Sequence, residues 1–152
     1  MEETERKSLY AALWARAMRA LARREHSEHE LRQKFKAGAP DELIDELIEA
    51  LLRDDLLSDA RFAQMLCRSR YKRGVGPVKI KYELQQHGIL SEWIEQAMTE
   101  YEAQWVDQLS ALRSRKYGER LPQDYREWAR QARFFQGKGF THEQIQRAIP
   151  RV

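Results

Sequence analysis

The sequence predicts an all-α protein built from three tandem three-helix units that form an elongated, curved stack. Apolar residues recur at helical spacing along nearly the whole chain, and no segment alternates polar with β-branched residues as a strand would. A second observation indicates repetition, because one set of positions recurs later with identical spacing: Leu84, Gly88, Ile89, Ile94 and Ala97 match Phe135, Gly139, Phe140, Ile145 and Ala148. A single unit would have a small core, so we expect the units to stack.

The first unit is expected to span residues 1–57. Its first helix places apolar residues on one face and arginines on the other, as an amphipathic helix does. Ser27 followed by Glu30 forms a capping box, which predicts a second, short helix that ends near Gly38. Pro40 and Asp41 open a third helix with a continuous apolar stripe.

The second unit is expected to span residues 58–102. Ser58 can cap its first helix, in which Phe62 begins the apolar stripe, so we predict that Phe62 is buried. Two glycines then stop this helix, and Pro77 suits the first position of the next one because its missing N–H is not needed there. Ser91 is the predicted cap of the third helix.

The third unit is expected to span residues 103–152. A helix begins near Trp105 and pauses at the polar stretch "KYGERLPQDY", and the helical pattern resumes at Trp128. Thr141 stands where a cap for the last helix is needed. The repeated pattern therefore accounts for a long, a short and a medium helix in each unit.

Charge is unevenly distributed along the chain, although the net charge is only +3. Residues 41–55 contain seven acidic side chains against the single base Arg53. Residues 61–81 contain seven cations and no acid. Such separation predicts distinct charged faces for charged partners.

We predict that partner or DNA contacts come from this basic stretch, from basic residues at equivalent places in the other units and from an interleaved tyrosine. The stretch breaks at Pro77, where the free backbone donors of a new helix would add to the positive field and favour an anion. DNA phosphates or protein carboxylates would both satisfy such a surface. The predicted contact residues are Arg16, Arg19, Arg23, Arg68, Arg70, Tyr71, Lys72, Arg73, Lys79, Lys81, Arg113, Arg115 and Lys116.

Several function classes find no support in the sequence. The four histidines form no HExxH motif, the single cysteine allows no internal disulfide or Cys-rich zinc site, and no nucleophile has a plausible base. We therefore expect no metal, no cofactor and no enzymatic activity. The charged N-terminus and the lack of a long apolar run predict a cytoplasmic protein without a membrane segment, and we expect a monomer.

The stretch "LLSDARFAQMLCRSRYKRGVGPVKIKYELQQHGI", residues 56–89, resembles the central signature of the RecX family. The matching elements are Arg-Phe-Ala, then Arg-x-x-x-Gly-x-Gly, then a short helix that ends in Leu-x-x-x-Gly-Ile. "HSEHELRQKF" (26–35) and "RKYGERLP" (115–122) resemble that family's first and third units. The resemblance therefore extends along nearly the whole chain.

The resemblance implies a modulator of the recombinase RecA that acts in homologous recombination, DNA repair and the SOS response. It implies binding of a RecA filament on single-stranded or duplex DNA, with restraint of filament growth, ATP hydrolysis and strand exchange. Whether the protein caps filament ends or lies in the groove stays open. The alternative is a helical DNA-binding protein that acts without RecA. An enzyme on nucleic acid is disfavoured because the sequence has no metal or nucleophile set.

Overall fold

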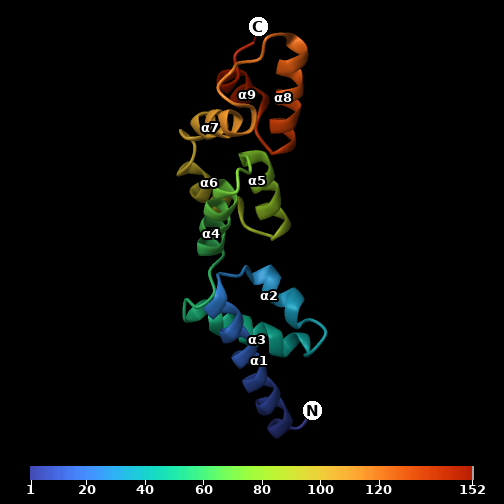
Figure 1. The fold of residues 1–152 in the computed structure, drawn as a ribbon. Coiled ribbons are helices and arrows are strands. Elements are labelled where there is room, and N and C mark those ends of the chain that lie inside the picture. The colour runs from blue at the N-terminus through green and yellow to red at the C-terminus, as the bar shows by residue number, and fades with distance from the viewer. Residues whose placement is uncertain (152) are drawn as a thin grey trace.

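The computed structural model describes residues 1–151, and all regular structure in this range is helical. The helices fall into three consecutive groups of three, which we call units 1, 2 and 3 (Figure 1). The predicted all-α fold is confirmed. Unit 1 contains α1 (Glu3–Arg23), α2 (Glu28–Phe35) and α3 (Asp41–Arg53); unit 2 contains α4 (Asp59–Lys72), α5 (Pro77–Gln86) and α6 (Ser91–Thr99); unit 3 contains α7 (Trp105–Tyr117), α8 (Tyr125–Gly137) and α9 (His142–Ala148).

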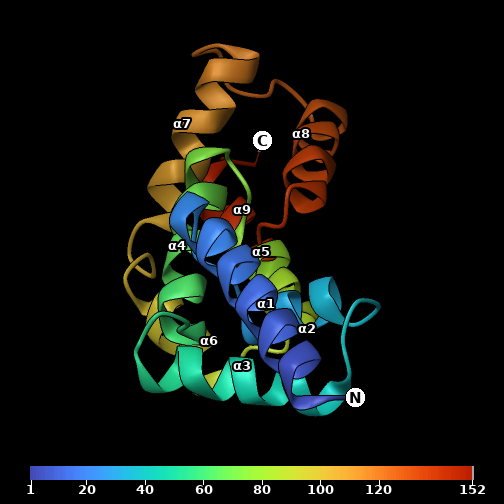
Figure 2. The same ribbon diagram turned by 90° about the horizontal axis from the view of Figure 1, so that it is seen from below.

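The units follow one another along a single long axis, with the N-terminus at one end of the molecule and the C-terminal segment at the other (Figure 1). A view along this axis shows α1 crossing in front of the later units (Figure 2). An elongated stack exposes more surface than a compact chain of the same length, so each unit keeps a large face in contact with solvent. This arrangement agrees with the predicted stack.

Most of the predicted helix starts are confirmed by their capping hydrogen bonds. Ser27 and Glu30 form the expected capping box at α2, and Thr141 forms a second one at α9. The Ser58 side chain accepts from the Arg61 N–H at the start of α4. The prediction for α6 was wrong, because Leu90 is the N-cap residue and Ser91 is already the first residue of the helix, without a side-chain cap.

The buried apolar residues form two separate clusters. One lies entirely in unit 1 and runs from Leu13 to Leu57. The other is continuous through units 2 and 3, from Phe62 to Ile149. Phe62 is 1% exposed, which confirms its predicted burial. Units 2 and 3 therefore share one core, whereas unit 1 has its own.

Two glycines bring the backbones of units 2 and 3 into direct contact. The N–H of Gly76 donates to the carbonyl of Lys138 at 2.7 Å, and the N–H of Val78 donates to the carbonyl of Gly139 at 2.9 Å. A Cβ atom at Gly76 would lie 2.5 Å from the carbonyl oxygen of Gly139, so only glycine fits there. The predicted anion site at the start of α5 is therefore wrong, since carbonyls of unit 3 already occupy these donors.

Polar contacts join unit 1 to unit 2. The N–H of Glu28, at the start of α2, donates to Asp59 Oδ1 at 2.8 Å. Arg61 pairs with Glu25 at 3.2 Å and with Asp55 at 3.0 Å. The turn around Gly88 lies next to the same end of α2. Unit 2 therefore contacts the start of α2, just as unit 3 contacts the start of α5. The contacts between units 1 and 2 are mainly made by side chains, whereas those at the start of α5 are made by the backbone.

Candidate anion-binding surface

The acid-free basic stretch divides in the structure into paired and unpaired cations. Arg61 is paired with Glu25 and Asp55 of unit 1, as described above. Arg70 donates from Nε and Nη2 to the two carboxylate oxygens of Glu83, at 2.9 and 2.6 Å. This two-point contact ties α4 to α5, and it lowers the pKa of Glu83. Arg70 is therefore a structural residue and does not belong to the free basic surface that the sequence predicted.

Five cations of the stretch remain exposed and form no ion pair within residues 1–151. Three lie in the last turn of α4 or just before and after it, where the negative end of the helix dipole favours positive charge. Two lie near the start of α5. Since neither group has an acidic partner among the residues that the structure describes, both are available to an external anion. The residues are Arg68, Lys72 and Arg73, and Lys79 and Lys81.

Tyr71 does not offer the free ring that its place among these cations predicted. Its ring lies 4.8 Å from that of Tyr101 and 5.4 Å from that of Trp105, centroid to centroid. Burial in this aromatic cluster raises the pKa of Tyr71. The side chain of Gln108 donates to the Tyr71 carbonyl at 2.9 Å. Tyr71 therefore helps to fasten α7 to unit 2, because packing between units competes with ligand stacking for the same ring.

Arg113 is also removed from the predicted contact surface, because it is only 3% exposed. Its guanidinium donates to the carbonyl of Gly118 at 3.1 Å, to the carbonyl of Arg120 at 3.3 Å and to the side chain of Gln131 at 3.4 Å. A buried guanidinium must be satisfied by such acceptors. Arg113 thus holds the connection between α7 and α8 in place.

Arg115 and Lys116 remain exposed and line a hollow of about 200 Å³ between units 2 and 3. Arg73 and Lys138 complete its basic rim. The Lys116 Nζ atom lies 4.2 Å from the centroid of the Phe134 ring, a cation–π contact. Leu112, Phe134 and Phe135 contribute apolar lining. The sequence prediction missed Lys138 and Phe134, because their closeness to Arg73 depends on how unit 3 docks.

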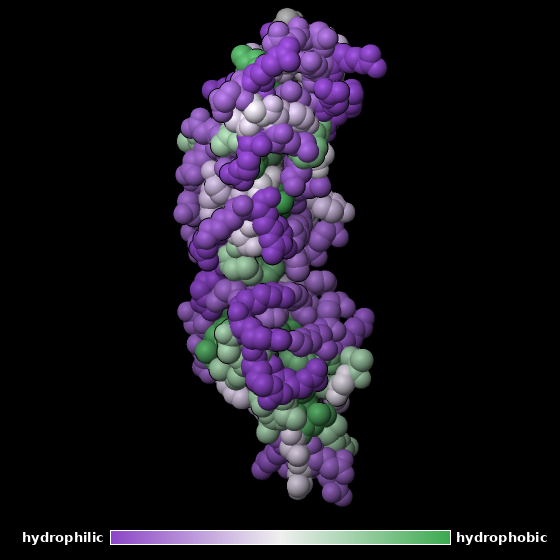
Figure 3. Space-filling view, viewed as in Figure 1, coloured by the Kyte–Doolittle hydropathy of each residue, from purple (hydrophilic) through white to green (hydrophobic). Residues whose placement is uncertain are grey.

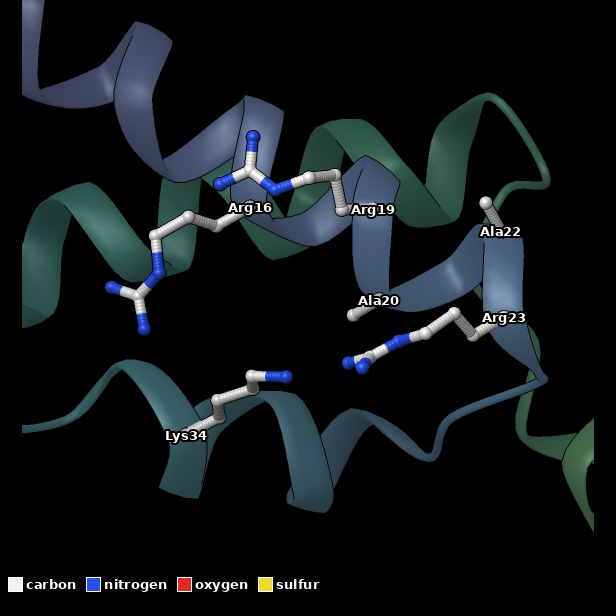
Figure 4. Close-up of a pocket in the computed structure, with 6 residues that line it drawn as sticks. All are labelled: Arg16, Arg19, Ala20, Ala22, Arg23 and Lys34. Carbon is white, nitrogen blue, oxygen red and sulfur yellow. The ribbon is translucent and has the colours of Figure 1, made fainter.

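A second basic hollow lies in unit 1, between α1 and α2, and has a volume of about 450 Å³. Figure 4 shows the long side chains that surround it, three from α1 and one from α2. The three from α1 are the predicted residues Arg16, Arg19 and Arg23, all exposed. The fourth is Lys34, which the sequence prediction missed. The sequence could have indicated Lys34 as a lining residue, because it lies in α2 next to the buried Phe35, on a helix that must pack against α1.

The hollow between units 1 and 2 differs in charge from these two. Its lining includes the pair Arg24–Glu30, at 2.6 Å, and the pair Arg70–Glu83. The two acids neutralise Arg24 and Arg70 and leave Arg73 as the one arginine of the lining that is unpaired within residues 1–151, so this hollow is less cationic than the other two. Of the three hollows, only those in unit 1 and between units 2 and 3 are purely cationic in their charged side chains.

The exposed face of α5 also carries apolar groups that the sequence prediction missed. Val78 is 53% exposed and Tyr82 is 63% exposed, one helical turn apart and next to Lys79 and Lys81. Aromatic and apolar groups among cations are typical of partner-binding surfaces. The face that includes α5 is otherwise largely hydrophilic (Figure 3).

The described residues form no group of His, Cys, Asp and Glu that could hold a metal ion. The single cysteine, Cys67, is buried in the core of units 2 and 3, and burial raises its pKa to about 11. A thiol with such a pKa is a poor nucleophile at neutral pH. Within residues 1–151 no helix is both long and apolar enough to span a bilayer.

Models of three domains match the chain in order: "RecX, first three-helix domain" over residues 14–51, "RecX, second three-helix domain" over residues 58–98 and "RecX, third three-helix domain" over residues 102–149. The chain belongs to the RecX family. Together the three RecX domains cover most of units 1, 2 and 3, and the family resemblance noted in the sequence is confirmed.

Curated relatives and solved structures agree with this membership. The chain is 42% identical over 133 residues to "Regulatory protein RecX" of Halorhodospira halophila, an alignment that covers 87% of this chain and 83% of the relative. It is also 42% identical over 134 residues to the protein of the same name from Pseudomonas savastanoi pv. phaseolicola, with 88% and 86% covered. The crystal structure of RecX from Lactobacillus salivarius has the same fold, with a TM-score of 0.78 at 22% identity over 92% of this chain and 94% of that one.

Proposed function

We propose that the protein binds RecA filaments on DNA and lowers the rates of RecA filament growth, ATP hydrolysis and strand exchange. The observation that carries this proposal is the match of all three units to RecX domains in their order along the chain. The family's relatives are named regulatory proteins. A regulatory role by binding needs no catalytic apparatus of its own.

The elongated stack suits contact with a repetitive assembly. Its units are each about 20 Å across on the scale of helix dimensions, so three of them can span neighbouring filament subunits. The unpaired cations lie in unit 1 and in units 2 and 3, which gives the chain two separated points of attachment. Two weak contacts on one rigid chain increase the overall affinity because the second one forms intramolecularly.

The unpaired cations would provide most of the attraction. Lysine and arginine bind phosphates and carboxylates through charge-assisted hydrogen bonds, and a cationic surface also accelerates encounter with an anionic filament. Val78 and Tyr82, exposed on α5 next to Lys79 and Lys81, would add apolar contact with a protein partner. A surface of this mixed kind favours a nucleoprotein filament over naked DNA as the ligand.

Co-sedimentation tests this proposal directly. The chain is centrifuged at near-physiological salt with DNA alone, and with DNA, RecA and a slowly hydrolysed ATP analogue. We expect tight association only when the RecA filament is present. Equal association with DNA alone would instead support a helical DNA-binding protein that acts without RecA, and would contradict the proposal.

Charge reversal at Lys79 and Lys81 tests the surface. Both side chains are exposed, and a glutamate retains the Cβ and Cγ atoms that Lys79 places near Gly139, so the fold should be preserved. We expect the double variant Lys79→Glu/Lys81→Glu to lose most inhibition of DNA-dependent ATP hydrolysis by RecA, with a nearly unchanged melting temperature. The control Lys7→Glu/Lys36→Glu makes the same change in net charge at exposed residues elsewhere. Full inhibition by the Lys79/Lys81 variant would contradict the role of this surface.

A further inference from the structure

The hollow between α1 and α2 concentrates positive charge that no acid of the described residues neutralises. No acidic side chain lines it, and its four cations form no ion pair within residues 1–151. Three other arginines of the same unit are neutralised, Arg6 by Glu46, Arg24 by Glu30, and Arg32 by Glu28 and Asp45, whereas Arg53, outside the hollow, forms no ion pair within residues 1–151. The unit has acids enough to pair its arginines, so the unpaired cluster marks this hollow as a place for an external anion.

One of the four cations, Arg16, is held in position by the packing beneath it. The guanidinium of Arg16 lies over the ring of Phe35, 5.0 Å from its centroid, and Phe35 is completely buried. Stacking of this kind leaves the edge N–H groups of the guanidinium free to donate. Lys34 precedes Phe35 in α2, whose start is fixed by a capping box. In Figure 4 the side chains of Arg16, Arg23 and Lys34 converge on the gap between the two helices.

The spacing along α1 fits a linear, regularly charged polymer. Arg16, Arg19 and Arg23 fall at positions i, i+3 and i+7 of one helix, and therefore form a row. At 1.5 Å per residue this row is about 10 Å long. One strand of DNA carries a phosphate about every 3.4 Å along its axis, so about three phosphates match the row.

Apart from its cations, the lining of the hollow offers no group that recognises bases. Its remaining residues are Ala20 and Ala22, which offer neither a ring for stacking nor an acceptor for a base edge. The ring of Phe35, beneath Arg16, is buried and covered by its guanidinium. Phosphate contact without base contact gives binding that depends on salt and does not depend on sequence.

We infer that this hollow binds the sugar–phosphate backbone of nucleic acid, through Arg16, Arg19, Arg23 and Lys34. The inference rests on the proposed function in taking the DNA of the filament as the ligand. It assigns phosphate contact to unit 1, and it adds Lys34 to the residues that make this contact.

Fluorescence anisotropy with the full chain and without RecA tests the inference. The probes are a labelled thymidine 20-mer and a labelled mixed-sequence duplex, each titrated at several salt concentrations. The variant Arg23→Gln/Lys34→Gln removes two charges from the hollow and leaves the stacked Arg16 in place. The matched control Lys7→Gln/Lys36→Gln removes two exposed charges of unit 1 outside the hollow. Circular dichroism checks that both variants keep their helical content.

We expect the variant Arg23→Gln/Lys34→Gln to bind both probes about 10- to 100-fold more weakly than the wild-type chain. The slope of its log affinity against log salt concentration should be smaller in magnitude by about 1.5. The control variant should change in affinity by less than about threefold. Inorganic polyphosphate should compete at lower charge concentrations than polyglutamate does. Equal losses in both variants, equal competition by polyglutamate, or no DNA binding by the wild-type chain would each overturn the inference. Because RecA is absent, a failure of the proposed RecA function leaves these results unaffected.

Discussion

The two junctions between the units use different physical chemistry for the same docking geometry. Unit 3 meets the start of α5 through backbone carbonyls at Lys138 and Gly139, and the apolar core continues across the junction. Unit 2 meets the start of α2 through Asp59 and Arg61, and the two apolar cores stay separate. The junction between units 2 and 3, the second along the chain, should therefore resist salt and pH, and the junction between units 1 and 2, the first along the chain, should respond to both.

The largest effect is expected from the core that units 2 and 3 share. Phe62→Ala removes a fully buried ring and should lower the free energy of unfolding by about 3–5 kcal/mol. Because unit 1 has a separate core, its amides should keep more of their protection than those of units 2 and 3. Segment-resolved hydrogen exchange measures both the loss of stability and the protection that remains in each unit. Equal loss of protection in all three units would show that the chain unfolds as one body and would remove the contrast between the junctions.

A methyl group at Gly76 should break the second junction. The added Cβ would lie 2.5 Å from the carbonyl oxygen of Gly139 and from the N–H nitrogen of Phe140, so the backbone must move. We expect Gly76→Ala to lower stability by about 1–3 kcal/mol or more, as overpacking does. Chemical denaturation measures the change.

Gly137→Ala is the matched control for the Gly76 variant. Gly137 lies in α8, and an added Cβ would have no neighbour within 4 Å. Alanine favours the helix at such a position, so this variant should be more stable by about 0.5–1 kcal/mol. Similar losses in both variants would mean that the close approach of units 2 and 3 is not what restricts position 76.

A smaller effect is expected at the first junction. Arg61→Gln removes both of its ion pairs, but these are partly exposed, so stability should fall by about 0–1 kcal/mol. The orientation of unit 1 should respond more strongly than its stability. Distances between spin labels in unit 1 and unit 2 should broaden in the variant, and also in the wild-type chain at high salt. A wild-type distribution that is narrow at every salt concentration would contradict an electrostatic junction.

The smallest effect is expected from pH at His26, next to the same junction. Its ring is buried, and its Nδ1–H donates to the carbonyl of Arg24 at 3.0 Å. Burial lowers the pKa of His26, so the folded chain resists a proton that the unfolded chain accepts below about pH 6.5. Stability should therefore fall as the pH falls through that value. Melting curves between pH 7.5 and 5.5 should lose part of this slope in His26→Gln, and should keep it in the control His142→Gln, at an exposed site.

The features that the sequence predicted correctly are local or periodic. The capping boxes at Ser27 and Thr141 involve residues three apart, and the burial of Phe62 follows from helical spacing. Such signals need no knowledge of how distant segments meet. The RecX signature added the order of the three units, which periodicity alone indicated only loosely for unit 1.

The features that the sequence did not predict depend on contacts between distant residues. Gly76 looked like a helix stop, but its closest neighbours come from Gly139 in unit 3. Arg70 lay in an acid-free stretch, yet its partner Glu83 comes from the next helix, just beyond that stretch. In the sequence Arg113 is one basic residue among several, but in the structure the α7–α8 connection covers it and accepts its hydrogen bonds. Charge along the chain therefore overstated the free positive surface.

The occupied start of α5 has a consequence for dividing the protein into fragments. A piece that ends after α6 would leave the N–H groups of Gly76 and Val78 without their carbonyl partners and would expose the half of the core that unit 3 covers. A piece that begins at Ser58 keeps these two hydrogen bonds and the whole core that units 2 and 3 share. The start of α2, by contrast, has the capping box of Ser27 and Glu30 within its own segment. Scission between Leu57 and Ser58 is therefore the cut that leaves each half a complete core, and the two halves could then be recombined through Asp59 and Arg61.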